Sequence, residues 1–182
     1  MKKYSDKELI RRCLKNKSDA QRMLYEKHSS MVYTVCYRYA KNAEDANDLL
    51  QETFINVFSN LEKFSGSGSF EGWVRRIAVN CAIRHYQKSE RRIDDGDIDY
   101  SPDAQTYADA IDHLSAEEIM HEINQLPDGY RIVFNMYAIE GYSHKEIAEH
   151  LNISESSSRS QLTRARVALM EKVGALEKVK LG

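Results

Sequence analysis

Proline, glycine and strand-like patterning are scarce in this sequence. Its 182 residues include two prolines and eight glycines, and no stretch alternates β-branched with polar residues as a half-buried strand does. Sheets and their tight turns depend on such features, so their scarcity predicts an all-helical, all-α fold. Hydrophobic residues make up 42% of the chain, enough for a core, and charged residues make up 30%.

Long apolar runs are also missing. No segment approaches the roughly 20 residues that a membrane-spanning helix needs. The amino terminus becomes polar at its second residue, unlike a signal peptide. We therefore expect a cytoplasmic protein without membrane insertion. Cys13, Cys36 and Cys81 fit that location, because they are too scattered for a disulfide framework or a zinc site and are best interpreted as small buried hydrophobes.

Signatures of catalysis are equally sparse. His121 and Glu122 could open a zinc-protease helix, but the second histidine is missing because residue 125 is Gln125. His144 and His150 lie six positions apart and do not share a helix face. The sequence contains no glycine-rich phosphate loop, Ser/His/Asp set or paired-cysteine motif. It predicts no enzyme, no catalytic residue, no metal and no cofactor.

Charge is distributed unevenly along the chain. The net charge is −2, yet residues 93–118 contain nine acids and no lysine or arginine, which leaves +7 on the remainder. Immediately before this stretch, residues 72–92 contain six basic residues and one acid. Such segregation suggests a polyanionic partner for the basic parts and a separate role for the acidic stretch.

Helical periodicity divides the chain into two sets of helices. We expect them at 6–16, 19–41, 43–61, 70–91, 116–125, 129–139, 144–151 and 155–172. Capping boxes fit the sequence at Ser5, Ser18, Ser115 and Ser143, and an N-cap fits at Asn42. We therefore expect two small helical domains, 1–92 and 116–178, joined by a flexible acidic linker, 93–115, that is too polar to fold alone.

The predicted helix 43–61 has two contrasting faces. Its expected core stripe consists of Leu49, Leu50, Thr53, Phe54, Val57 and Leu61. The opposite face carries the acids Asp45, Asp48 and Glu52. An acidic face is commonly only solvated, but Ile55 lies among these acids and favours an interface with a partner protein.

The predicted helix 70–91 separates a core arc from a mixed aromatic and polar arc. The core arc holds Val74, Ala78, Val79, Ala82, Ile83 and Tyr86. The other arc holds Trp73, Arg76, Ile77, Asn80, Arg84, Gln87 and Lys88. Unstacked bases can lie on aromatic rings while nearby cations hold the phosphates, so this arc suits nucleic acid. The preceding loop adds Phe64, Phe70 and glycines. In the simpler alternative, Trp73 and Phe70 are core residues and the arginines keep the surface soluble.

Residues 143–169 predict a helix-turn-helix with its turn at Asn152-Ile153-Ser154. The residues expected to pack inward are Ile147, Ala148, Leu151, Ile153, Leu162, Ala165 and Leu169. Base contacts are assigned to Ser156, Ser157, Arg159 and Ser160, and phosphate contacts mainly to Arg164 and Arg166, with Thr163 on the same outer face. Arg159 is the main candidate for sequence preference, because an arginine bidentate to guanine is worth about 1–3 kcal/mol. Helix pairs of this kind also occur as plain packing units.

Four motifs in one order resemble those of bacterial RNA polymerase sigma factors. They are NAEDANDLLQETF (42–54), FSGSGSFEGWVRRIAVN (64–80), LPDGYR (126–131) and GYSHKEIA (141–148). The short two-domain form is similar to the extracytoplasmic-function (ECF) subclass, which keeps only sigma domains two and four. The resemblance covers nearly the whole chain and implies an initiation factor that directs core RNA polymerase to specific promoters.

The resemblance also implies roles for the predicted faces. The face with Asp45, Asp48, Gln51, Glu52 and Ile55 would dock on the clamp coiled coil of the polymerase β′ subunit. The residues that would open the −10 element and hold a flipped non-template base are Phe64, Ser67, Ser69, Phe70, Trp73, Arg76, Asn80 and Arg84. The second domain would bind the −35 element as duplex while resting on the β flap. The acidic linker would run toward the RNA exit channel and could mimic the transcript. An anti-sigma factor is a further expected partner, since many members of the subclass are held inactive by one.

Ser158 departs from the family pattern. Recognition helices of the family often carry an apolar β-branched residue at this inward position. A buried hydroxyl needs a partner, and the carbonyl of Ser154 one turn back is the expected one. We therefore expect the recognition helix to be slightly tilted.

Two other functions fit parts of the sequence. One is a free-standing helix-turn-helix regulator that never engages polymerase, although residues 1–92 resemble no ligand-binding, receiver or dimerisation domain. The other is a protein-interaction module, such as an anti-sigma factor or adaptor, whose basic faces are incidental.

Overall fold

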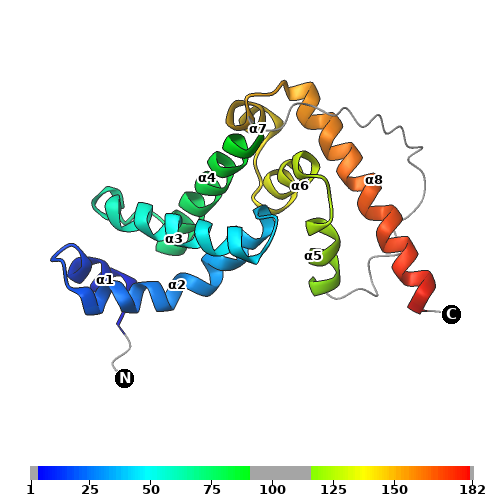
Figure 1. Ribbon diagram of the computed structural model, residues 1–182. Coiled ribbons are helices and arrows are strands. Elements are labelled where there is room, and N and C mark those ends of the chain that lie inside the picture. Colours follow the sequence, from blue (N-terminus) through cyan, green and yellow to red (C-terminus); the bar gives the residue numbers. More distant parts are fainter. Residues whose placement is uncertain (1–3, 91–115, 181–182) are drawn as a thin grey trace. The chain divides into compact units, whose positions relative to one another are not determined.

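The computed structural model describes residues 4–90 and 116–180, and every regular element in these ranges is helical (Figure 1). The first range contains α1 (Asp6–Cys13), α2 (Ser18–Tyr39), α3 (Ala43–Ser59), the short η1 (Leu61–Lys63) and α4 (Phe70–Glu90). The second contains α5 (Ala116–Asn124), α6 (Asp128–Phe134), the π-helix η2 (Asn135–Ile139), α7 (His144–Leu151) and α8 (Glu155–Lys180). The all-α prediction is therefore confirmed.

The chain divides into two compact units, residues 1–88 and 89–182, each with its own core. The predicted linker, 93–115, lies outside the described residues, as does the capping residue Ser115, so the linker and the domain boundaries beside it stay predictions. None of the described helices is long and apolar enough to cross a membrane.

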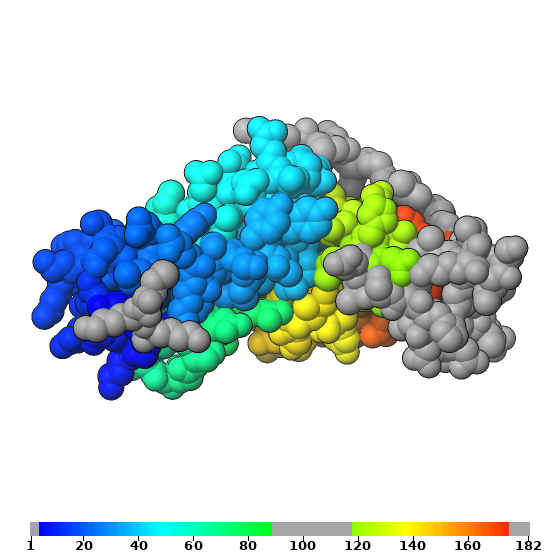
Figure 2. All heavy atoms as spheres, turned by 90° about the horizontal axis from the view of Figure 1, so that it is seen from below, coloured from blue at the N-terminus to red at the C-terminus, as the bar shows by residue number. Residues whose placement is uncertain are grey.

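In the first unit, α1 and α3 both pack against α2. Figure 2 shows α1, α2 and α3 forming one continuous face of this unit. The expected stripe of α3 is buried throughout, and in α4 the expected core arc is buried except for the half-buried Tyr86. All three cysteines are free and buried, and burial raises the pKa of Cys36 to about 11. They are core residues, as predicted.

Helix starts follow the predicted caps only in part. Asn42 caps α3, since its side chain accepts from the amide of Asp45, and Ser5 accepts from the amide of Glu8. Ser143 forms a complete capping box with Glu146 at the start of α7. The prediction at Ser18 is wrong, because Ser18 is the first residue of α2 and the preceding lysine is the N-cap.

The second unit is organised around α8, against which α5, α6 and α7 pack. A cluster of Ile123, Leu126, Ala165 and Leu169 joins α5 and the turn after it to α8. In the LPDGYR motif, the buried guanidinium of Arg131 pairs with Asp128 at 3.0 Å and donates to the carbonyl of Asn124 at 3.3 Å. The motif therefore fixes the turn between α5 and α6.

Three predicted helices differ most from the observed ones, and the limits of the others agree within two residues. Helix α1 ends at Cys13 rather than at 16, and Asn16 takes a positive φ of 55° in the turn that follows. The helix expected at 129–139 is α6 followed by the π-helix η2. Helix α8 continues to Lys180, beyond the expected end at 172. Single-turn π-helices inside helices often occur at functional positions.

Candidate nucleic-acid interface

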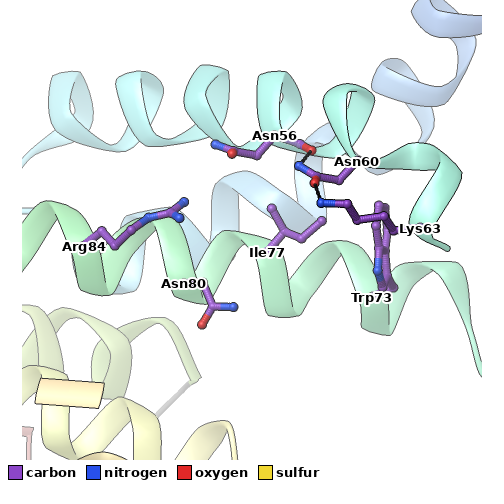
Figure 3. A pocket seen from close by; sticks show the side chains of 7 residues that line it. All are labelled: Asn56, Asn60, Lys63, Trp73, Ile77, Asn80 and Arg84. Atoms are coloured by element: carbon purple, nitrogen blue, oxygen red, sulfur yellow. Dashed lines mark hydrogen bonds between the residues drawn. The ribbon is translucent and has the colours of Figure 1, made fainter. Parts of the chain in front are cut away.

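A pocket of about 250 Å³ lies between α3 and α4 of the first unit (Figure 3). It is lined by Asn56, Asn60, Lys63, Trp73, Ile77, Asn80 and Arg84. Three of these residues, Trp73, Asn80 and Arg84, were predicted to contact the −10 element. The other four were not among the predicted −10 contacts. The pocket lining combines an aromatic ring, three amides and two cations, which can together contact a base and a phosphate.

The α3 wall of this pocket is a ladder of hydrogen bonds. Lys63 Nζ donates to Asn60 Oδ1 at 2.7 Å, and Asn60 Nδ2 donates to the carbonyl of Asn56 at 2.8 Å. Asn56 Nδ2 donates to the carbonyl of Glu52 at 2.8 Å. Sequence reasoning missed this wall. Its signal was the spacing of Asn56, Asn60 and Lys63 at i, i+4 and i+7, which places all three on one helix face.

The α4 wall carries the predicted residues at different depths. Arg84 is exposed, and its guanidinium lies 3.3 Å from Cys81 Sγ and 3.9 Å from a carboxylate oxygen of Glu52. Figure 3 shows the amide of the half-buried Asn80 pointing away from α3. Arg76 is exposed on the same helix but does not line the pocket.

Two further aromatic rings pack against Trp73. The rings of Phe64 and Trp73 lie 5.5 Å apart, and the rings of Phe70 and Trp73 stack at 5.6 Å. Phe70 is only 4% exposed and also meets the ring of His28 edge-on at 5.3 Å. Phe70 therefore packs in the core beneath Trp73, as the simpler alternative held, whereas Trp73 and Phe64 are half-buried.

The loop between η1 and α4 lines a second pocket of about 640 Å³. Gly66 and Gly68 both take positive φ values, 76° and 82°, which only glycine adopts without strain. Ser67 is exposed, whereas Ser69 caps α4 by accepting from the amide of Gly72 at 3.0 Å. The loop therefore presents backbone more than side chains.

The opposite wall of the second pocket comes from α1 and was also missed. It includes Asp6, Lys7 and Ile10. Asp6 Oδ1 accepts from Lys27 Nζ at 2.7 Å and lies 3.0 Å from Nε2 of the buried His28. Burial acts to raise the pKa of Asp6, but the hydrogen bonds from Lys27 and His28 outweigh it and lower that pKa. The carboxylate of Asp6 thus fixes the start of α1 to α2.

The predicted clamp-contact face lies on the outer side of α3. Ile55 is 66% exposed, and Asp48 and Gln51 are exposed beside it, while Asp45 and Glu52 are half-buried. An isoleucine this exposed among acids agrees with the expectation of an interface with another protein.

The predicted helix-turn-helix is present in α7 and α8. Asn152 ends α7 in the left-handed conformation with φ 56° and ψ 44°, and Ser154 Oγ accepts from the amide of Ser157 at 3.0 Å to cap α8. Ile147, Ala148, Leu162, Ala165 and Leu169 are buried, and Leu151 and Ile153 are half-buried. The turn and the inward face were therefore predicted correctly.

The outer face of α8 presents the predicted DNA contacts, most of them already hydrogen-bonded. Ser156, Arg159, Ser160, Thr163 and Arg166 are exposed, and Ser157 and Arg164 are half-buried. Arg159 pairs with Glu155 at 2.8 Å. The hydroxyls of Ser156 and Ser157 lie 2.8 and 2.9 Å from Ser154 Oγ. Ser160 and Thr163 donate to helix carbonyls one turn back.

Ser158 has an unexpected partner. It is fully buried, as predicted, but its hydroxyl lies 2.9 Å from Nδ1 of His144, the first residue of α7. The expected bond to the Ser154 carbonyl is wrong, because packing of α7 against α8 brings the ring of His144 within reach of this hydroxyl instead.

Two family models match the two units. "Sigma-70 region 2" matches residues 24–92, and "Sigma-70, region 4" matches residues 116–169. The first therefore covers the α3–α4 pocket, and the second covers the helix-turn-helix.

Curated relatives agree over most of the chain. The ECF RNA polymerase sigma factor SigW of Bacillus subtilis is 30% identical over 179 residues, covering 92% of this chain and 96% of its own. The ECF RNA polymerase sigma factor SigE of Mycolicibacterium smegmatis is 32% identical over 153 residues, covering 81% of this chain and 59% of its own. The RNA polymerase sigma-H factor of Pseudomonas aeruginosa is 28% identical, covering 90% and 91%.

These matches decide among the three functions that the sequence left open. They include region 2, which a free-standing helix-turn-helix regulator or an anti-sigma module would not need. Sigma factors are initiation factors rather than enzymes, and they use both regions to recognise promoters. The chain belongs to the ECF RNA polymerase sigma factors of the sigma-70 family.

Proposed function

We propose that this sigma factor opens the −10 element with the α3–α4 surface of its first unit and reads the −35 element as intact duplex with α8. The observation that carries the proposal is the pocket at Trp73, where an aromatic ring, amides and cations line one cavity. A base leaving the stack costs a few kcal/mol, and a pocket of this chemistry can offset that cost.

Within the pocket, the residues differ in what they offer a base. The half-buried ring of Trp73 offers a stacking surface. Asn80 carries both a donor and an acceptor, so it suits the edge of a base. Lys63 and Arg84 supply positive charge for the phosphates on either side. Ser67, Ser69 and the glycines of the loop bring the backbone close to the strand.

On α8, Ser156, Ser157, Arg159 and Ser160 face the base edges, and Arg164 and Arg166 hold phosphates, with Thr163 beside them. This assignment rests on their position in the first turns of the second helix of a helix-turn-helix. The guanidinium of Arg159 donates to Glu155 at 2.8 Å, and a bidentate contact to a base would require Arg159 to turn away from Glu155.

The protein partners follow from family membership. The outer face of α3, with Asp45, Asp48, Gln51, Glu52 and Ile55, docks on the clamp coiled coil of the β′ subunit, and the second unit rests on the β flap. An anti-sigma factor binds the free protein and keeps it from polymerase. All of these encounters take place in the cytoplasm, where promoter DNA and core polymerase are found.

The test begins with assembly and then separates the two DNA contacts. The full chain is mixed with core polymerase, isolated by gel filtration and used in runoff transcription on promoter DNA. Asn80→Ala should impair melting of the −10 element with little change in upstream binding. Permanganate reactivity of unpaired thymines measures the melting, and His85→Ala, on the same helix but outside the pocket, is the control.

Two results would contradict the proposal. One is a chain that joins core polymerase but directs no start-site-specific transcript. The other is an Asn80→Ala holoenzyme that melts the −10 element as fast as the wild type.

A further inference from the structure

A polar and aromatic chain of contacts connects three elements of the second unit behind the outer face of α8. Ser158 Oγ lies 2.9 Å from His144 Nδ1. The ring of His144 stacks on that of Tyr137 with centroids 4.6 Å apart and planes 22° apart. The guanidinium of Arg166 lies 5.8 Å above the ring of Tyr137. The chain of contacts therefore begins and ends on α8.

The two ends of this chain fix α8 at separated points. Ser158 and Arg166 are eight residues apart, about 12 Å along a helix at 1.5 Å per residue. Ser158 is buried on the inner face, whereas Arg166 is exposed. At 3.6 residues per turn the two positions are about 80° apart around the helix axis, so contacts at both resist rotation of α8 about its axis as well as sliding along it.

The π-helix η2 supplies the middle of the chain. Tyr137 is the third of its five residues, and His144 follows as the first residue of α7, directly after the capping residue Ser143. His144 is therefore fixed at the backbone by a capping box and at the ring by a stack. A buried hydroxyl would lose about 1–3 kcal/mol without a partner, so the bond to Ser158 is one that the fold must keep.

We infer that Tyr137, His144 and Ser158 are positioning residues that set the rotation of the recognition helix and thereby the −35 sequence that the holoenzyme prefers. This inference rests on the proposed reading of the −35 element by α8. Base readout depends on which side chains reach a base edge, so a small rotation of the helix replaces one contact with another. Arg159 and Arg166 both lie on α8, so they turn together with it.

Four variants separate the contribution of the His144–Ser158 hydrogen bond from that of the His144–Tyr137 ring stack. His144→Phe keeps an aromatic ring for the stack and loses the hydrogen bond. His144→Asn keeps a polar atom for Ser158 and loses the stack. Ser158→Val introduces the apolar type of side chain that the family often has, and the double variant His144→Phe with Ser158→Val replaces the polar pair by an apolar one. His150→Phe, on the same helix, is the matched control, because the ring of His150 meets the ring of Tyr142 edge-on and takes no part in the contacts between Tyr137, His144 and Ser158 described above.

The test uses holoenzyme assembled from the full chain and core polymerase, with a promoter library randomised in the −35 element. Sequencing the transcripts gives the ratio between the preferred and the next-best upstream sequence, and thermal unfolding gives stability. Each single variant should lower that ratio about tenfold, the size of one lost base contact. The double variant should recover the wild-type melting temperature but keep an altered preference. His150→Phe should leave the ratio unchanged.

A purely structural role gives a different pattern. In that case the variants would weaken all upstream sequences alike, or the double variant would regain both stability and the wild-type preference, and either result overturns the inference. If the wild-type holoenzyme itself prefers no upstream sequence, both the proposed −35 reading and the present inference fail. If the wild type has a preference that all the variants share, only the present inference fails.

Discussion

The two proposed nucleic-acid surfaces of this sigma factor are built in opposite ways. The first is a concave pocket between two helices, with a half-buried tryptophan and amides that are fixed by bonds along α3. The second is the convex outer face of one helix, covered by small hydroxyls and arginines. A cavity suits a base that has left the stack, and a convex polar helix suits the groove of an intact duplex.

The two surfaces also differ in which hydrogen bonds must break when DNA binds. The pocket can receive a base while its α3 ladder stays intact. On α8, Arg159 is paired with Glu155, and the hydroxyls of Ser160 and Thr163 donate to their own helix. The hydroxyl oxygens of Ser160 and Thr163 still have free lone pairs. These oxygens can therefore accept hydrogen bonds from DNA without breaking the bonds within the helix. Arg159 has to exchange partners, and its orientation therefore matters more.

The largest effect is expected at Trp73. Trp73→Ala should slow opening of the −10 element about 5- to 150-fold, because stacking a base on an aromatic ring is worth about 1–3 kcal/mol. Binding to the upstream duplex should not change, because Trp73 belongs to the first surface alone. Permanganate footprinting over time measures the opening. Trp73→Phe, which keeps a ring, should lose much less, and wild-type opening by Trp73→Ala would show that no base stacks there.

Arg159→Ala is expected to have the next largest effect, on the second surface alone. Preference at one base pair of the −35 element should fall by about 1–3 kcal/mol, since a bidentate contact to guanine is lost. Competition binding of holoenzyme to upstream duplexes with single substitutions measures it. Arg164→Ala is the control, because loss of a phosphate contact weakens all duplexes alike and reduces the salt dependence by about one unit of slope. If Arg159→Ala weakened binding to every duplex equally, Arg159 would contact a phosphate rather than a base.

Mild acid should weaken the second surface through His144. Burial, and then the charges of Arg159 and Arg166, lower the pKa of His144 below its ordinary value of 6.5, with Glu155 opposing them. The unfolded chain therefore binds this proton more tightly than the folded one. The resulting stability is complete above pH 6.5 and is lost as the pH falls through the lowered folded-state pKa.

NMR titration of the histidine ring signals should place the midpoint of His144 below 6.5. Urea unfolding of the full chain should show less loss of stability between pH 7.5 and 5.5 in His144→Gln than in the wild type. A midpoint at or above 6.5 would contradict the lowered pKa expected from partial burial and from the two arginines.

The smallest effect is expected at Glu155. An exposed pair at i, i+4 is worth about 0.3–0.5 kcal/mol, so Glu155→Gln should strengthen upstream duplex binding about twofold by releasing Arg159. Fluorescence anisotropy of a labelled −35 duplex with holoenzyme measures this. Glu149→Gln removes an exposed acid from α7 instead, and an equal gain in that variant would mean that only net charge was changed.

Local patterns predicted much of the fold and the outer faces. Periodicity gave the core stripes of α3 and α4, and the turn at Asn152 followed from the gap between two amphipathic segments. These features depend on neighbours within about two helical turns, which a sequence displays directly. The same reasoning placed Ile55 and Trp73 away from the core interior.

Contacts between distant elements could not be predicted in this way. Ser158 is bound by His144, fourteen positions earlier, rather than by the carbonyl one turn back. The spacing of Asn56, Asn60 and Lys63 places them on one face, but only packing shows that this face meets α4, where Asn56 Nδ2 lies 3.5 Å from Cys81 Sγ. The cap expected at Ser18 failed because the turn after α1 begins α2 one residue earlier than expected. Tertiary packing decided the first two of these positions, and a local turn decided the third.

Trp73 is the single tryptophan of the chain, and this allows the division of labour between the surfaces to be tested directly. The chain is labelled with 5-fluorotryptophan, assembled with unlabelled core polymerase and observed by fluorine NMR. A single-stranded non-template −10 oligonucleotide should shift the resonance of Trp73, and a −35 duplex should leave it unchanged. A shift caused by the duplex, or none caused by the single strand, would contradict the account.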